Sequence, residues 1–134
     1  MMNRLCLAIL LALLFGLTPA AHAKELVQQF SGDVSADTPE FEVLAPWIVE
    51  WRITGEPNPM AAADISLMNA DTGTMVGQVL RTGRASERGK LFKQSGHYYF
   101  HVKSSKMHWA LHVLEVSPKE ARQYESKTRK TPYS

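Results

Sequence analysis

The sequence predicts an all-β protein, a single antiparallel β-sandwich of about eight strands followed by a short C-terminal helix. Short segments of alternating apolar and polar residues, separated by turn residues, occupy most of the chain. Helical periodicity is absent before Ser117, so the chain offers no crossover helices for a parallel sheet. The predicted connectivity is jelly-roll-like or immunoglobulin-like, although the Cys-Trp-Cys pattern of true immunoglobulin domains is absent.

Residues 1–23 have the features of a secretory signal peptide. Arg4 precedes an apolar run over residues 5–17, and the stretch ends in Ala21-His22-Ala23, an Ala-x-Ala cleavage pattern. The run is shorter than the roughly 20 apolar residues that a bilayer-spanning helix needs. We therefore expect export to the periplasm or the exterior, cleavage after Ala23, and no transmembrane segment in the mature chain.

The mature chain is expected to form one domain, with the sandwich in residues 24–117 and a short helix and polar, basic tail in residues 118–134. Its single cysteine, Cys6, leaves with the signal peptide, which excludes disulfides, thiol catalysis and cysteine-ligated zinc. Acidic residues predominate from residue 24 to 80 and basic residues from 81 to 134. This asymmetry indicates either an anionic partner or strands from the two halves that neutralise each other.

The strongest strand pattern is PWIVEWRI, residues 46–53. Its odd-numbered positions, including Trp47 and Trp51, share one face of a strand, while Glu50 and Arg52 share the other. This alternation places both tryptophans in the core, whereas exposed tryptophans would offer a stacking platform for a sugar.

Weaker patterns complete the sandwich. Residues 69–73 form the turn of a predicted hairpin, and residues 83–89 are predicted to be a charged loop. Ser117 caps a short helix that begins at Pro118 and extends to about residue 123 or 124. Further strands are predicted around residues 26–30, 41–43, 65–67, 75–82, 91–92, 97–103 and 108–116.

Residues 95–116, SGHYYFHVKSSKMHWALHVLEV, resemble the closing strands of the bacterial pre-peptidase C-terminal domain and its jelly-roll relatives. Domains of that family end in a Gly-x-Tyr-Tyr strand, a short turn and an alternating apolar strand. The resemblance implies an extracytoplasmic accessory or binding sandwich rather than a catalytic one. The resemblance assigns a functional role to no individual residue of this chain.

Four histidines lie on the last two predicted strands: His97, His101, His108 and His112. In a hairpin that sets His101 opposite His108 and His97 opposite His112, facing Cβ atoms would lie about 5 Å apart. Such imidazoles could share zinc or copper, and Met107 would add a soft ligand for copper. A register shifted by two residues would separate them and leave an ordinary polar sheet face.

A basic set lies in and around the predicted charged loop and consists of Arg81, Arg84, Arg88, Lys90 and Lys93. Such clusters attract phosphate and carboxylate groups, with an affinity that falls as salt rises. In an exported protein the available anions are envelope glycans or lipids. The alternative is a solvated loop without a ligand. Tyr99 is the candidate aromatic contact, because its strand face is opposite to the core face.

The sequence therefore predicts an exported, non-catalytic binding or accessory sandwich that contacts anionic envelope glycans or lipids, or a secreted partner protein. A periplasmic zinc- or copper-binding sandwich is the alternative, and the sequence specifies no other cofactor. A small secreted hydrolase ranks third, because the chain has no Gly-x-Ser-x-Gly elbow and Glu40, Glu42 and Glu50 occupy solvent-facing strand positions. Nucleic acid is not an expected partner, since the net charge is near neutral.

Overall fold

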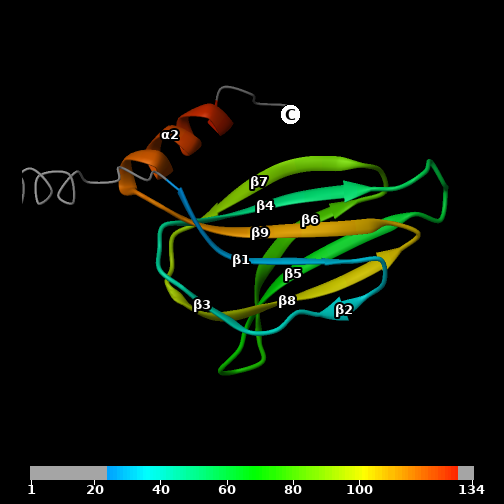
Figure 1. Cartoon of the computed structure of the whole chain (residues 1–134), viewed down its shortest axis with the longest axis horizontal. Helices are drawn as coiled ribbons and strands as arrows, with labels where there is room; N and C mark the ends of the chain where they lie inside the picture. Colours follow the sequence, from blue (N-terminus) through cyan, green and yellow to red (C-terminus); the bar gives the residue numbers. More distant parts are fainter. Residues whose placement is uncertain (1–23, 130–134) are drawn as a thin grey trace, which may run out of the picture.

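The computed structural model describes residues 24–129, which form two antiparallel sheets packed face to face and one helix, α2 (Pro118–Arg129) (Figure 1). The predicted signal peptide, residues 1–23, and the end of the predicted tail, residues 130–134, lie outside the described residues. Within residues 24–129 no helix has the length and apolar character needed to cross a bilayer. The strands are β1 Lys24–Gly32, β2 Ala36–Asp37, β3 Phe41–Val43, β4 Trp47–Thr54, β5 Ala62–Asn69, β6 Met75–Thr82, β7 Ser86–Phe92, β8 Gly96–Ser105 and β9 His108–Val116.

The strand order confirms the antiparallel sandwich and shows its connectivity. The first sheet has the order β1-β9-β4-β7, and the second has the order β2-β8-β5-β6, with β3 also paired to β8. Among the described strands, β5 and β6 are the only consecutive ones that pair with each other. Apart from β5–β6 and from β2 and β3, which both pair with β8, the chain alternates between the sheets. This is the wrapping of a jelly roll rather than of an immunoglobulin domain.

The core lies between the sheets and contains the predicted tryptophans. Trp47, Trp51 and Trp109 are 0%, 9% and 3% exposed. The indole N–H of Trp47 donates to the carbonyl of Gln94 at 2.9 Å, and that of Trp109 donates to the carbonyl of Val34 at 3.0 Å. Because these large rings are buried and their polar atoms are satisfied, the prediction of core packing is confirmed.

Strand β7 corrects the predicted charged loop at residues 83–89. Residues 86–89 belong to β7, which pairs with β4 from Ser86 opposite Ile53 to Phe92 opposite Trp47. Only residues 83–85 remain as the connection from β6. The prediction was wrong because β7 is an edge strand, where charged side chains reach water without leaving the sheet.

Helix α2 is longer than predicted and packs on the outer face of the first sheet (Figure 1). Its start is as predicted, since the backbone N–H of Glu120 donates to Oγ of Ser117 at 3.1 Å. Ala121 packs with Ile48 and Val116 in a small apolar cluster separate from the main core. This second contact stabilises helix beyond the first turns, which the capping pattern alone does not predict.

Candidate functional site

The four predicted metal ligands are not brought together. Strand β8 pairs with β2, β3 and β5, while β9 pairs with β1 and β4, so the predicted hairpin between them is wrong. His97 and His101 lie on the outer face of the second sheet, and His108 and His112 on the outer face of the first. The reason is the link at residues 106–107, where buried Met107 carries the chain from one sheet to the other.

Two of these histidines instead contact aspartates of the crossover segment, residues 33–40, which passes from the first sheet to the second. Nδ1 of His108 lies 2.5 Å from Oδ1 of Asp33, and Nδ1 of His101 lies 2.5 Å from Oδ1 of Asp37. Each histidine therefore fixes one point of the crossover segment by a hydrogen bond to a carboxylate.

His97 contacts two acidic residues. Its Nδ1 lies 3.0 Å from Oδ1 of Asp71, and its Nε2 lies 3.1 Å from Oε1 of Glu40 in the crossover segment. The hydrogen bond with Asp71, and the nearby charges of Glu40, Asp71 and Glu42, raise the pKa of His97 above its usual value. The two acids meet opposite nitrogens of the ring, so these groups do not face a common point. In the described part of the chain, no cluster of three or more His, Cys, Asp or Glu side chains could hold a metal.

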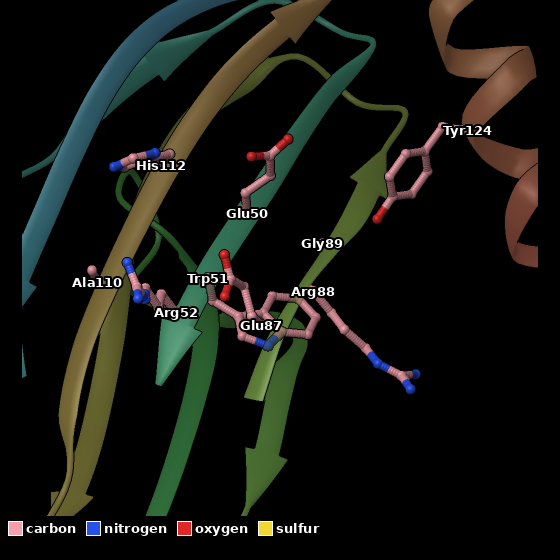
Figure 2. A pocket seen from close by; sticks show the side chains of 9 residues that line it. All are labelled: Glu50, Trp51, Arg52, Glu87, Arg88, Gly89, Ala110, His112 and Tyr124. Carbon is pink, nitrogen blue, oxygen red and sulfur yellow. The ribbon is translucent and has the colours of Figure 1, made fainter. Parts of the chain in front are cut away.

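A hollow of about 530 Å³ lies on the outer face of the first sheet beside α2 (Figure 2). The hollow exists because two residues at its base have small side chains or none. Gly89 of β7 is directly opposite Glu50 of β4, and Ala110 of β9 is directly opposite Arg52. Longer side chains at these two positions would fill the space between neighbouring strands.

Polar side chains of both charges surround the base of this hollow. Glu50 and Arg52 come from β4, Glu87 comes from β7 and His112 comes from β9. The register sets His112 directly opposite Glu50, and Glu87 directly opposite Arg52. Glu50 also lies 3.4 Å from Nζ of Lys24. The hollow therefore presents hydrogen-bond donors and acceptors to solvent.

Tyr124 of α2 closes one side of the hollow (Figure 2). Its ring reaches over Gly89, where an added Cβ would lie 2.7 Å from the tyrosine hydroxyl. Burial of the phenol and, secondarily, the charge of Glu50 raise the pKa of Tyr124 above its usual value. The hydroxyl is therefore neutral at physiological pH and can donate a hydrogen bond.

Arg84 and Arg88 of the predicted basic set lie at the exposed edge of the first sheet. Arg88 lines the hollow, and its guanidinium extends outward from β7 in Figure 2. Arg84 lies in the short connection before β7 and is exposed. Neither forms an ion pair with a described carboxylate.

The two lysines of the set have partners. Nζ of Lys90 donates to the carbonyl of Gln78 at 2.8 Å, which connects β7 to β6 across the open side of the sandwich. That contact satisfies a donor but leaves the positive charge uncompensated. Lys93 instead forms an ion pair with Glu125 of α2. Lys90 and Lys93 line a smaller hollow of about 300 Å³ that shares Gly89 and Tyr124 with the first.

Tyr99, the predicted aromatic contact, lies elsewhere. It occupies the outer face of the second sheet, directly opposite Met68 of β5, and is half-buried. The face was predicted correctly, but the basic set is on the other sheet. The structure thus separates the predicted aromatic residue from the predicted cations.

The residues that shape the hollow were not predicted. Gly89 interrupts a charged stretch that resembles a loop, and Ala110 occurs within an ordinary strand pattern. Tyr124 follows Ala121 by three residues, a spacing that places both on one face of a helix and could have identified it. The acidic positions considered for catalysis do not converge, because Glu42 lies on β3 of the second sheet and Glu50 on β4 of the first.

Comparison with known proteins adds no relative: no family model matches the chain, and no curated protein matches it significantly. The resemblance of residues 95–116 to the pre-peptidase C-terminal domain therefore stays a prediction.

Proposed function

We propose that the protein is exported and acts as a non-catalytic binding module for a linear acidic glycan of the cell envelope. The contact surface is the β7 strip, which comprises Arg84, Arg88 and Lys90, together with the adjoining hollow. The observation that carries the proposal is the charge of this strip, since none of its three cations forms an ion pair with a described carboxylate. The neighbouring cation Lys93 does form one, with Glu125.

The spacing of the strip suits a polymeric anion. Arg88 and Lys90 are two residues apart on one strand, which separates them by about 6.6 Å, and Arg84 precedes them at the β6–β7 connection. A row of cations at this interval can meet successive acidic groups along an extended chain. The polar groups of the hollow, including Glu87 and Arg52, lie on the adjoining outer face of the first sheet and suit sugar hydroxyls.

A glycan fits this surface better than a lipid bilayer does. Stable attachment to a lipid surface usually combines basic residues with inserted apolar side chains. In the described part of the chain, the exposed large apolar side chains lie outside β7 and α2: Leu26, Val34, Leu44, Met60, Met75 and Val76.

Charge reversal tests the proposal. Arg84→Glu combined with Arg88→Glu should weaken retention on immobilised polygalacturonate about thirtyfold. At each of the two sites an attraction of about 0.5 kcal/mol becomes a repulsion of about 0.5 kcal/mol. Lys119→Glu combined with Arg122→Glu is the matched control, because it changes the net charge equally at exposed positions of α2. Retention of the wild-type protein should fall as salt rises.

Three outcomes would contradict the glycan proposal. Equal loss in the two double variants would mean that net charge alone governs retention. Unchanged retention after reversal of Arg84 and Arg88 would remove the β7 strip from the contact. Binding to vesicles of anionic lipid, without retention on polygalacturonate, would replace the glycan by a membrane. Export is tested separately by mass spectrometry of the protein from the exported fraction. The measured mass should be that of a chain that begins at Lys24.

A further inference from the structure

The outer face of the second sheet has a hollow of its own, of about 320 Å³. Two methionine side chains line it, Met68 of β5 and Met75 of β6, and the register sets them directly opposite each other. His101 of β8 lines the same hollow and is directly opposite Ser66, two positions from Met68 along β5. Because Ser66 is small, the space above it stays open between the imidazole and the thioethers.

His101 has the carboxylate partner that is typical of a metal-ligating histidine. Its Nδ1 is held by Asp37 of the crossover segment at 2.5 Å, which leaves Nε2 as the second ring nitrogen. A carboxylate on one imidazole nitrogen, with the other nitrogen directed to an ion, is the common arrangement of ligating histidines. His108, on the other sheet, has an equivalent contact with Asp33, but it lines none of the described hollows.

Three of the other polar groups of the hollow, Asp64, Gln78 and Arg81, are engaged with one another. Arg81 donates to Oδ2 of Asp64 at 2.9 Å, and Gln78 donates to Oδ1 at 3.0 Å. The hydrogen bond from Arg81 is the main cause that lowers the pKa of Asp64, so this carboxylate is ionised and paired. Its charge offsets that of Arg81, and Lys103 lies directly opposite it on β8. Lys103 and Ser66 also line the hollow, and the sulfur and nitrogen ligands that it offers to a metal ion are two thioethers and one imidazole.

This donor set selects the metal. Thioether sulfur is a soft ligand that favours Cu(I), whereas zinc sites use thiolate, imidazole and carboxylate. Met75 is 58% exposed, so an ion in solution can reach its side chain. Both methionine side chains are flexible enough to converge on an ion from neighbouring strands.

We propose that Met68, Met75 and His101 bind a Cu(I) ion on the outer face of the second sheet, with Asp37 as a positioning residue for the imidazole. The site lies on the sheet opposite to the β7 strip and does not depend on glycan binding. It also differs from the predicted four-histidine site, of which it retains one member.

The test is a competition for Cu(I) between the purified mature protein and bathocuproine disulfonate, without oxygen. The wild-type protein should withdraw one equivalent of Cu(I). Met68→Leu, Met75→Leu and His101→Gln should each lower the affinity at least about tenfold, and Asp37→Asn about tenfold through the imidazole. Leucine conserves methionine volume, and a thermal unfolding scan would verify that each variant is folded.

Met60→Leu is the matched control, because Met60 is also exposed, at 69%, but lies in the β4–β5 loop and does not line the hollow. X-ray absorption of the loaded protein should show sulfur ligands that disappear in the Met68→Leu, Met75→Leu double variant. Failure of the wild-type protein to compete would overturn the proposal. A loss of affinity in Met60→Leu equal to that in Met68→Leu, or a copper spectrum without sulfur, would also overturn it.

Discussion

Histidine–acid contacts fix the path of the crossover segment between the sheets. His108 holds Asp33 near its beginning, His101 holds Asp37, and Nε2 of His97 contacts Glu40 at its end. Between these points, Thr38 exchanges two hydrogen bonds of 2.9 Å with the backbone of Phe100. Three of the four histidines predicted as metal ligands therefore hold the crossover segment, and sequence alone could not show it because their partners lie far away in the chain.

One pH dependence follows from His97. Its pKa is raised in the folded protein above the usual value of about 6.5, so the folded state binds this proton more tightly than the unfolded state does. The resulting stabilisation is complete below the unfolded pKa and disappears as pH rises through the folded pKa. His97→Gln should therefore lower the urea midpoint more at about pH 5.5 than at about pH 8. Equal losses at the two pH values would contradict this assignment.

At the scale of elements, α2 covers part of a row of apolar residues on the outer face of the first sheet. The strand register places Leu26, Leu114, Ile48 and Leu91 in this row, from β1 to β7. Ile48 is 1% exposed because Ala121 of α2 packs on it, whereas Leu26 at the uncovered end is 51% exposed. The helix thus protects one half of the row and leaves the other half in contact with water.

This difference in burial predicts that substitution by alanine lowers the free energy of unfolding by different amounts at Ile48 and at Leu26. Ile48→Ala should lower the free energy of unfolding by about 2–5 kcal/mol, because it opens a cavity beneath α2. Leu26→Ala, in the same row, should change the free energy of unfolding by less than about 0.5 kcal/mol. Urea unfolding of the two variants measures both values. Similar losses would mean that α2 does not cover Ile48.

The elements also show why part of the fold could be predicted and part could not. Burial alternates along β4 from Val49 to Thr54 as it does in the sequence, so the inner face of that strand was predictable. The sequence could not show whether β8 and β9 pair with each other. Two strands that pair in one sheet and two strands that face each other across a core have the same alternation of apolar and polar residues. The short link at residues 106–107 resembles a hairpin turn but crosses between the sheets.

For the whole molecule, the jelly roll interleaves early and late strands. The order β1-β9-β4-β7 places strands from the acidic first half beside strands from the basic second half. The sequence left open whether this charge asymmetry marks a partner or is neutralised within the fold. The contacts of His101 and His108 with aspartates join the two halves of the chain. No described carboxylate, however, forms an ion pair with the cations of the β7 strip.

The measurement that tests the glycan proposal most directly is an NMR titration of the isotope-labelled mature protein with an oligogalacturonate. A fully methyl-esterified oligomer of equal length serves as the neutral control. With the acidic oligomer, we expect amide shifts concentrated in β7, the 83–85 connection and the part of α2 around Tyr124, and with the ester we expect no such shifts. Shifts confined to the second sheet, or shifts of equal size with both oligomers, would contradict it.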